Sequence, residues 1–188
     1  MLTSRFEQAF LYACRLHGQQ RRKGAGTPYI AHLMAVTALV LEHGGDEDQA
    51  IAALLHDAVE DQGGRKTLGE IRARFGERVA NMVAELSDSD TTPKPPWRER
   101  KRAYLAHLPH ASPDVLLISL ADKLHNARAI LRDYRALGEE LWPRFKGGKE
   151  GTLWYYRELV NIFRQVYGGY LVDELAAVVS EIERLAES

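Results

Sequence analysis

A histidine and three acidic residues lie within six consecutive positions at the end of an apolar run. His56 and Asp57 come first, and Glu60 and Asp61 follow four positions later. Because positions i and i+4 share one face of a helix, we expect His56 to lie beside Glu60 and Asp57 beside Asp61. No Lys or Arg occurs within residues 24–64 to neutralise these acids. A bound cation or a protonated carboxyl group would relieve their repulsion, and a divalent metal ion is the simpler explanation.

Two other segments present side chains of the same kind. Asp122 ends the apolar run 116–121, and His32 lies one predicted helix before His56. Two histidines and two aspartates suit a divalent ion such as Mn, Fe or Zn. A structural zinc finger is excluded, since Cys14 is the only cysteine. The alternative is a helix C-terminus with solvated acids and a histidine that interacts with the helix dipole.

Helical periodicity runs through most of the chain, and no alternating strand pattern of any length occurs. Apolar residues at spacings of three and four predict a helix over 3–18, which Thr3 could cap. Thr67, with Glu70 three positions later, predicts a capping box. Further helices are predicted over residues 30–43, 47–61, 67–74, 77–87, 98–107, 112–135, 137–142, 151–167 and 170–186. The sequence therefore predicts an all-α single domain of eight to ten helices.

Composition restricts the class of protein. The chain has 188 residues, of which 45% are hydrophobic and 27% charged, as in an ordinary globular domain. Collagen-like, disulfide-rich and disordered classes are excluded. The single cysteine indicates a reducing compartment, and we expect a cytoplasmic protein. Without a long apolar run or a signal peptide core, no membrane association is expected.

The net charge of −1 argues against non-specific binding of nucleic acid, but it hides a segregation of charge. Basic clusters flank the acidic segment 24–64, and they lie within residues 15–23, 94–102 and 144–149. The predicted loops 19–29, 88–97 and 143–151 overlap these clusters and could form the rim of a site. Solvated helix faces are the alternative explanation.

The order His32, His56-Asp57, Asp122 resembles the HD superfamily of metal-dependent phosphohydrolases. Three segments narrow the resemblance to the RelA/SpoT-type (p)ppGpp hydrolase domain, and in particular to the stand-alone small alarmone hydrolases. These segments are HGQQRRKGAGTPYIAH at 17–32, HDAVED at 56–61 and ADKLHNAR at 121–128. Ordered boxes with these flanking residues are a much more specific signal than an HD pair alone. The resemblance covers about residues 5–130.

This resemblance implies a fold, an activity and a cofactor. The fold would be a helical HD domain with its motifs in residues 5–135, followed by C-terminal helices over 136–188. The activity would be a guanosine-3′,5′-bis(diphosphate) 3′-diphosphatase that converts (p)ppGpp to GDP or GTP and pyrophosphate in the stringent response. The cofactor would be Mn²⁺, with Fe, Zn or Mg as alternatives.

The resemblance also implies roles for individual residues. The metal ligands would be His32, His56, Asp57 and Asp122. Glu60 and Asp61 would orient and activate the attacking water. Arg22 and Lys23 would hold phosphates, and Asn126 would lie near the nucleotide. Lys123 and Arg128 of the third motif could also offset phosphoryl charge, and an ordinary surface charge is the alternative for either.

The segment 145–157 lies beyond the resemblance and combines lysines with aromatic residues. Lys149, Tyr155 and Tyr156 are candidates for substrate contact, through charge and through stacking on a base. An ordinary loop followed by core-packing aromatics is the alternative.

Two other functions stay open. The first is an HD phosphohydrolase that acts on another nucleotide, such as a nucleoside phosphate or NADPH. The second is a helical module that senses a nucleotide without cleaving it. A small nucleotide is the expected partner, and the helix over 170–186 could pack on the core or serve a homodimer.

Overall fold

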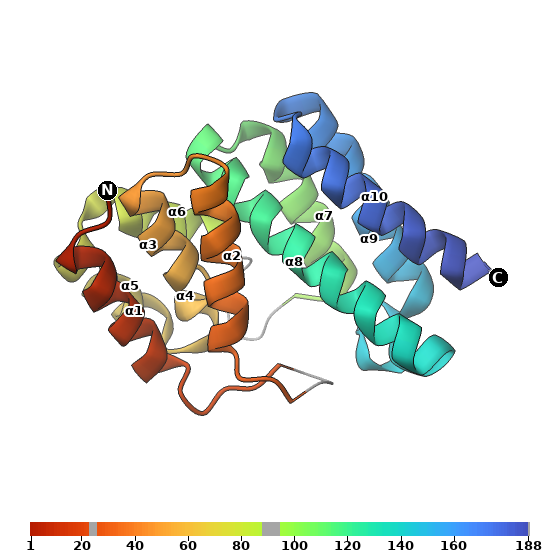
Figure 1. The fold of residues 1–188 in the computed structure, drawn as a ribbon, viewed down its shortest axis with the longest axis horizontal. Coiled ribbons are helices and arrows are strands. Elements are labelled where there is room, and N and C mark those ends of the chain that lie inside the picture. The colour runs from red at the N-terminus through yellow and green to blue at the C-terminus, as the bar shows by residue number, and fades with distance from the viewer. Residues whose placement is uncertain (23–25, 88–94, 188) are drawn as a thin grey trace.

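The structure is a computed structural model that describes residues 1–22, 26–87 and 95–187. Within these ranges the regular elements are helices, apart from one isolated bridge between Arg21 and Pro28, so the all-α prediction is confirmed. The helices are α1 (Ser4–Leu16), α2 (Ile30–Glu42), α3 (Glu47–Leu55), α4 (Ala58–Asp61), α5 (Gly64–Phe75), α6 (Glu77–Leu86), α7 (Trp97–His107), α8 (Pro113–Leu137), α9 (Gly148–Val166) and α10 (Tyr170–Glu187), with short 3₁₀ helices at Leu108–His110 and Gly138–Arg144 (Figure 1).

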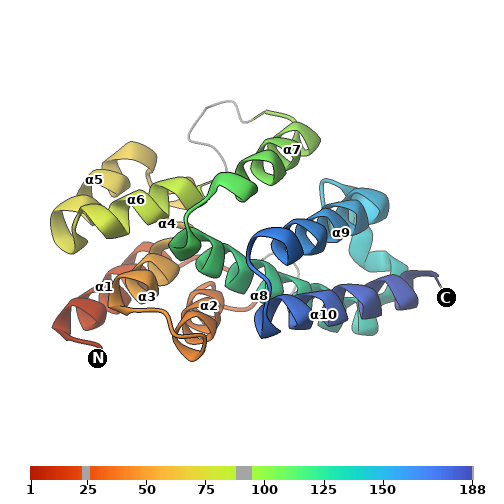
Figure 2. The same ribbon diagram turned by 90° about the horizontal axis from the view of Figure 1, so that it is seen from above.

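The long helix α8 runs through the middle of the molecule. Helices α1 to α6 lie on one side of it, and α7, α9 and α10 lie on the other (Figures 1 and 2). Ser112 caps its first turn by accepting a hydrogen bond from Val115 N, and Gly138 ends it with a positive φ of 56°. Its residues 115–122 are all buried, because helices cover it on both sides. This central position brings Asp122 into the interior between the two groups of helices.

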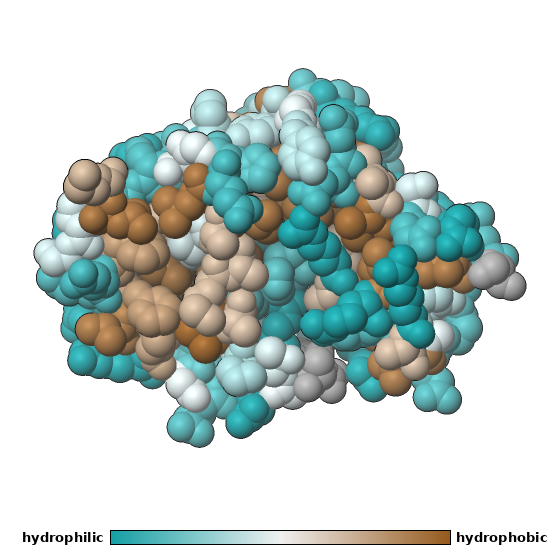
Figure 3. All heavy atoms as spheres, viewed as in Figure 1, coloured by the Kyte–Doolittle hydropathy of each residue, from teal (hydrophilic) through white to brown (hydrophobic). Residues whose placement is uncertain are grey.

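The apolar side chains form a core that extends over both groups of helices. One apolar area stays at the surface over α1 and α2 (Figure 3), where Leu11 and Met34 are 54% and 44% exposed. No helix in the described part of the chain has both the length and the apolar character that crossing a bilayer requires.

Two local predictions are wrong. The segment 47–61 is not one helix, because the chain turns at His56 and Asp57 between α3 and α4. Asp57 has φ −95° and ψ −2°, and the His56 ring donates to the carbonyl of Ala53. No capping box forms at Thr67, because α5 already begins at Gly64 and the buried Thr67 hydroxyl donates to a backbone carbonyl. The predicted cap at Thr3 is confirmed, since its side chain accepts from Arg5 N.

Trp97 joins α7 to the start of α9. A Cβ added to Gly147 would lie 2.6 Å from Trp97 Cη2, and one added to Gly151 would lie 3.1 Å from Trp97 Cζ3. The indole also meets the rings of Trp154 and Tyr155 edge-on, with centroids 6.4 and 6.2 Å apart. Glycine at both positions therefore lets the indole approach the α9 backbone and fixes where α7 lies.

We expect Gly147→Ala to destabilise the protein by about 1–3 kcal/mol, because the new methyl group overpacks against a rigid indole ring. The backbone at Gly147 has φ −83°, so alanine causes no dihedral strain there and the effect is steric. Urea unfolding measures it. Gly69→Ala within α5 is the matched control, since a Cβ there meets nothing within 4 Å, and it should be neutral or slightly stabilising. Equal stability of Gly147→Ala and the wild type would contradict the tight fit.

Candidate active site

Two histidines and two aspartates from three helical regions meet beside α8. His32 lies in the first turn of α2, His56 and Asp57 form the turn between α3 and α4, and Asp122 lies on α8. Ligand atoms of the first three lie within 4.8 Å of one another. Asp122 Oδ1 lies 3.2 Å from His32 Nε2 and 3.7 Å from His56 Nε2. One small cation could contact the first three side chains, and Asp122 lies beside both imidazoles.

The hydrogen bonds of His56 leave one ring nitrogen facing this cluster. Its Nδ1 donates to the carbonyl of Ala53 at 2.8 Å, so in a neutral ring Nε2 carries the lone pair. Among the described residues this buried Nε2 has no hydrogen-bond partner, although Asp57 Oδ2 lies 3.1 Å away. A cation would satisfy both atoms.

His32 has a similar support on its far side. Its Nδ1 lies 2.8 Å from Nδ1 of His125, so one of the two rings donates to the other. Burial, assisted by the neighbouring His32, lowers the pKa of His125 to about 4. A neutral His125 can accept the hydrogen bond and leave His32 Nε2 as a ligand atom.

The aspartates are held as carboxylates. Burial disfavours the charged form of Asp57, but the adjacent His56 outweighs it and holds the Asp57 pKa below its usual value. Burial likewise opposes ionisation of Asp122, yet the ammonium group of Lys123, 2.7 Å away, holds its pKa well below the usual range. The Tyr29 hydroxyl donates to Asp57 Oδ2 at 2.5 Å. Both carboxylates are thus ready to bind a cation.

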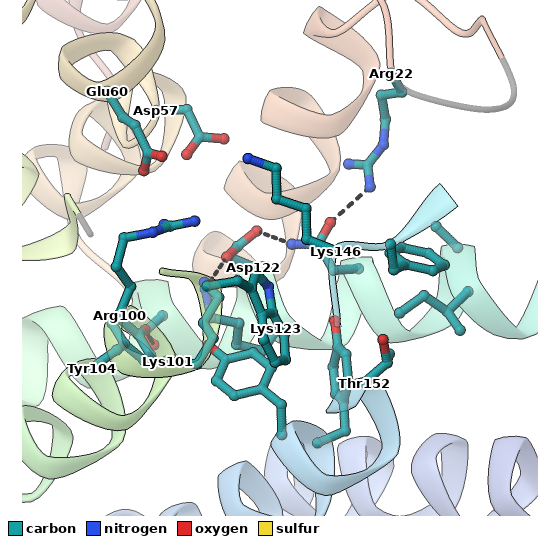
Figure 4. A pocket seen from close by; sticks show the side chains of 18 of the residues that line it. Arg22, Asp57, Glu60, Arg100, Lys101, Tyr104, Asp122, Lys123, Lys146 and Thr152 are labelled. Carbon is teal, nitrogen blue, oxygen red and sulfur yellow. Dashed lines mark hydrogen bonds and ion pairs between the residues drawn. The ribbon is translucent and has the colours of Figure 1, made fainter. Parts of the chain in front are cut away.

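The cluster opens into a cavity of about 510 Å³. Figure 4 shows side chains reaching it from several elements, with Arg22 from the segment after α1, Arg100 and Lys101 from α7, and Lys146 from the segment before α9. Carboxylates and cations therefore line one concave space. Such a space suits a small molecule that carries several negative charges.

Most of the candidate residues from the sequence are brought together here. Besides His56, Asp57 and Asp122, the residues that line the cavity include Glu60, Asp61, Arg22, Asn126, Tyr155 and Tyr156. Arg22 donates to Asn126 Oδ1 at 2.7 Å, and Asn126 donates to Asp122 Oδ1 at 2.6 Å. Lys23 lies outside the described residues.

Two of the sequence candidates, Arg128 and Lys149, are not among the residues that line the cavity. Arg128 forms an ion pair with Glu174 of α10. Lys149 binds Glu139 at 2.9 Å and the carbonyl of Ala186 at 2.6 Å. Both side chains tie the C-terminal helix to its neighbours, and neither lines the cavity.

Sequence reasoning missed the contribution of α7. Trp97, Arg100, Lys101 and Tyr104 line the cavity, although only the basic charge of residues 94–102 was visible in the sequence. The ammonium groups of Lys123 and Lys101 lie 4.8 and 5.8 Å from the centre of the Tyr104 ring. Cation–π contacts of this kind hold the lysine side chains beside the cavity.

A family model described as HD domain matches residues 9–152, and all four residues of the His/Asp cluster lie within that match. The chain belongs to the HD domain family. The donor set, with a buried imidazole nitrogen of His56 that faces two carboxylates, fits the divalent metal ion that this family implies.

Curated HD relatives resemble the chain over most of its length. The guanosine-3′,5′-bis(diphosphate) 3′-pyrophosphohydrolases MESH1 of Xenopus tropicalis and of Homo sapiens are each 44% identical over 138 residues, which are 72% of this chain and 72% of each relative. A guanosine-3′,5′-bis(diphosphate) 3′-pyrophosphohydrolase of Aquifex aeolicus is 36% identical over 66% of this chain and 17% of its own length.

Solved structures show the same HD fold. A metazoan ortholog of SpoT, described as hydrolysing ppGpp, superposes with a TM-score of 0.78 at 29% identity and covers 96% of this chain and 97% of its own. The protein lmo0812 of Listeria monocytogenes superposes with a TM-score of 0.70 at 30% identity, over 81% of this chain and 99% of its own.

We expect the apparent affinity of this HD domain for Mn²⁺ to rise with pH. Burial lowers the pKa of His56, but Asp57 and Asp122 outweigh burial and raise it well above its usual value in the metal-free protein. A metal ion binds only the neutral imidazole, so binding releases this proton. Affinity should increase about tenfold per pH unit while His56 is protonated in the metal-free state. Calorimetric titration with Mn²⁺ in buffers of different ionisation enthalpy measures the release, and an affinity that stays constant as the pH rises through the ordinary imidazole pKa of about 6.5 would contradict it.

Proposed function

We propose that this protein is a metal-dependent hydrolase that removes the 3′-diphosphate of (p)ppGpp. The observation that carries the proposal is the combination in one cavity of a His/Asp cluster, two further carboxylates and a set of cations. The named activity of the HD relatives, at 44% identity, supports the same substrate. The products are GDP or GTP and pyrophosphate.

We assign the residues as follows. The side chains of His32, His56, Asp57 and Asp122 hold the metal ion, for which Mn²⁺ is our proposal. When bound, this ion polarises a phosphoryl oxygen and makes water a better nucleophile near neutral pH. Glu60 and Asp61 line the cavity next to this cluster, where a carboxylate can orient the attacking water and accept its proton.

The bond changes follow from this assignment. Water attacks the phosphorus that is attached to the ribose 3′-oxygen, and the bond from that phosphorus to the 3′-oxygen breaks. The proton of the water passes to Glu60 or Asp61, and the 3′-oxygen takes up a proton as it leaves. Arg22 and Lys123 line the cavity and offset the negative charge that spreads over the phosphoryl oxygens.

The remaining cations suit a substrate with two charged groups. Arg144 and Lys146 line the cavity on the side of α9, and neither forms an ion pair within the described part of the chain. A ppGpp molecule carries a diphosphate on each side of its ribose. We propose that these residues contact the end of the nucleotide that faces away from the metal cluster, beside Tyr155 and Tyr156.

We also propose that residues 1–188 work as one HD domain. Helix α9 lies beyond the motif-bearing segment, yet Thr152, Tyr155 and Tyr156 of this helix line the cavity. The apolar core extends from α8 into α9 and α10. Removal of the C-terminal helices would therefore expose the core and open the cavity.

The decisive assay compares nucleotides with the Mn²⁺-loaded protein. Release of pyrophosphate from ppGpp is measured beside release of phosphate from NADPH and from nucleoside phosphates. We expect ppGpp to be turned over with the highest kcat/KM. Turnover of another nucleotide while ppGpp is left intact would show that ppGpp is not the substrate. Binding of ppGpp without turnover of any nucleotide would indicate a sensor in place of an enzyme.

A further inference from the structure

The segment between α1 and α2 contacts the site at several points. Gln20 Nε2 donates to Asp61 Oδ2 at 2.7 Å, and Tyr29 donates to Asp57 Oδ2 at 2.5 Å. Arg22 reaches Asp122 through Asn126. This one connecting segment thus reaches three carboxylates: Asp61 and Asp57 by direct hydrogen bonds, and Asp122 through Asn126. Of these contacts, only the one from Gln20 reaches a carboxylate that lies outside the His/Asp cluster.

The orientation of the Gln20 amide is determined by its neighbours. Its oxygen Oε1 lies 2.6 Å from His17 Nδ1 and accepts a hydrogen bond from Gln62 Nε2 at 2.7 Å. Two donors occupy the two lone pairs of this oxygen. The NH₂ group must therefore point the other way, which is toward Asp61.

His17, which contacts the Gln20 oxygen, is almost fully buried. Its side chain is 1% exposed and stacks on the Tyr29 ring, with centroids 5.3 Å apart and planes 18° apart. Among the described residues its Nε2 has no hydrogen-bond partner. Nδ1 donates to Gln20 while the buried Nε2 has no such contact in the described part of the chain, and leaving Nε2 without a hydrogen bond costs free energy.

The backbone fixes the segment against α2. Gln20 N donates to the His17 carbonyl and Tyr29 N donates to the Gln20 carbonyl, both at 2.9 Å. Arg22 N donates to the Thr27 carbonyl at 2.8 Å. Both ends of the Gln20 peptide are thus held, and a side chain on such a backbone presents its amide in one place.

We propose that Gln20 is a positioning residue for Asp61, and that it holds this carboxylate toward the cavity through an amide whose direction His17 and Gln62 impose. An amide is suited to the task, because it donates a hydrogen bond to the carboxylate and cannot take a proton from it. The inference rests on the proposed function only in assuming that Asp61 orients the attacking water. Arg22 lies two residues after Gln20, so the segment that positions Asp61 also carries a side chain proposed to contact phosphate.

The test replaces Gln20 by glutamate and, as a control, replaces the neighbouring Gln19 by glutamate as well. Gln20→Glu keeps the shape but loses the N–H donor, and Gln19→Glu adds the same charge at an exposed position of the same segment. We expect Gln20→Glu to lower kcat for ppGpp by about 100-fold, the lower end of what a positioned proton acceptor contributes. KM and Mn content should stay within about threefold of the wild type, whereas Gln19→Glu should match the wild type in all three.

The pH profile separates positioning from a general structural effect. On acidification the introduced carboxyl group takes up a proton and can again donate to Asp61. The deficit of Gln20→Glu relative to the wild type should therefore shrink as pH falls. Gln20→Leu also lacks the donor but cannot regain one, so its deficit should stay constant with pH.

Gln62→Leu provides a variant outside the segment. It removes one of the two donors to the Gln20 oxygen, and we expect kcat to fall by about three- to tenfold without loss of metal. Thermal unfolding of each variant shows whether the fold is kept, and if Gln20→Leu unfolds, Gln62→Leu decides. Wild-type kcat in Gln20→Glu, or a loss of activity that only follows loss of metal, would overturn the proposal.

Failure of the proposed function gives a different result. If the wild type leaves ppGpp untouched, the substrate assignment is wrong, and the same variants are then compared on the nucleotide that the protein does hydrolyse. Gln20→Glu should lower kcat there as well, because the contact with Asp61 does not depend on the identity of the nucleoside.

Discussion

Replacing Asp57 with alanine is expected to abolish turnover and to remove most of the bound metal. Asp57 Oδ2 lies 3.1 Å from His56 Nε2 and 3.8 Å from His32 Nε2, so it is one of the two carboxylates, with Asp122, that lie beside both imidazoles. The variant loses one of four proposed ligands together with its charge. We expect kcat/KM for ppGpp to fall at least about 1,000-fold, equivalent to ~4 kcal/mol of activation free energy.

The measurement is metal content after reconstitution with Mn²⁺, together with turnover of ppGpp. Asp173→Ala, at an exposed position in the first turn of α10, removes the same charge away from the cavity and should keep both properties. Urea unfolding of the metal-free proteins checks the fold, because the variant also leaves the Tyr29 hydroxyl without its acceptor. A full complement of metal in Asp57→Ala would exclude this residue as a ligand.

The sequence allowed the His/Asp cluster to be predicted because each member interrupts an otherwise apolar stretch. His56 and Asp57 follow the buried α3, and Asp122 lies among the buried residues of α8. A polar side chain at such a position costs free energy unless it has a partner, so its presence points to a site. The helices were predictable for a related reason, since their apolar faces repeat with the helical period.

Details of local geometry were not predictable from the same patterns. A spacing of four puts two side chains on one face only if the helix is continuous, and the turn at His56 and Asp57 breaks it. Thr67 has the sequence of a helix cap, yet a positive φ at Gly63 and Gly64 lets α5 begin earlier. The backbone conformation of a glycine is set by tertiary packing, so it cannot be predicted from the spacing of residues in the sequence.

The rim of the cavity depends on contacts between distant segments. Lys149 belongs to a basic cluster that suggested phosphate binding, but its ammonium group donates to the carbonyl of Ala186 in α10. Conversely, α7 faces the cavity because Trp97 fits against two glycines about 50 residues later in the chain. Neither relation leaves a periodic signal, so charge alone could not tell which lysines and arginines reach the substrate.

Replacing Glu60 with alanine is expected to abolish turnover while the metal stays bound. Glu60 lines the cavity and extends from α4 beside Asp57 (Figure 4), and it is not one of the two aspartates that lie beside both imidazoles. If it orients the attacking water and takes its proton, kcat for ppGpp should fall by about 10²–10⁴-fold with little change in KM.

Metal content distinguishes this role from ligation. Glu60→Ala should bind as much Mn²⁺ as the wild type, in contrast to Asp57→Ala, and Glu42→Ala at the exposed end of α2 is the control for loss of a negative charge on the same acidic segment. Equal loss of metal in Glu60→Ala and Asp57→Ala would make Glu60 a ligand, and unchanged kcat would leave Asp61 as the acceptor of the proton. The two variants together thus separate the residues that hold the ion from those that act on water.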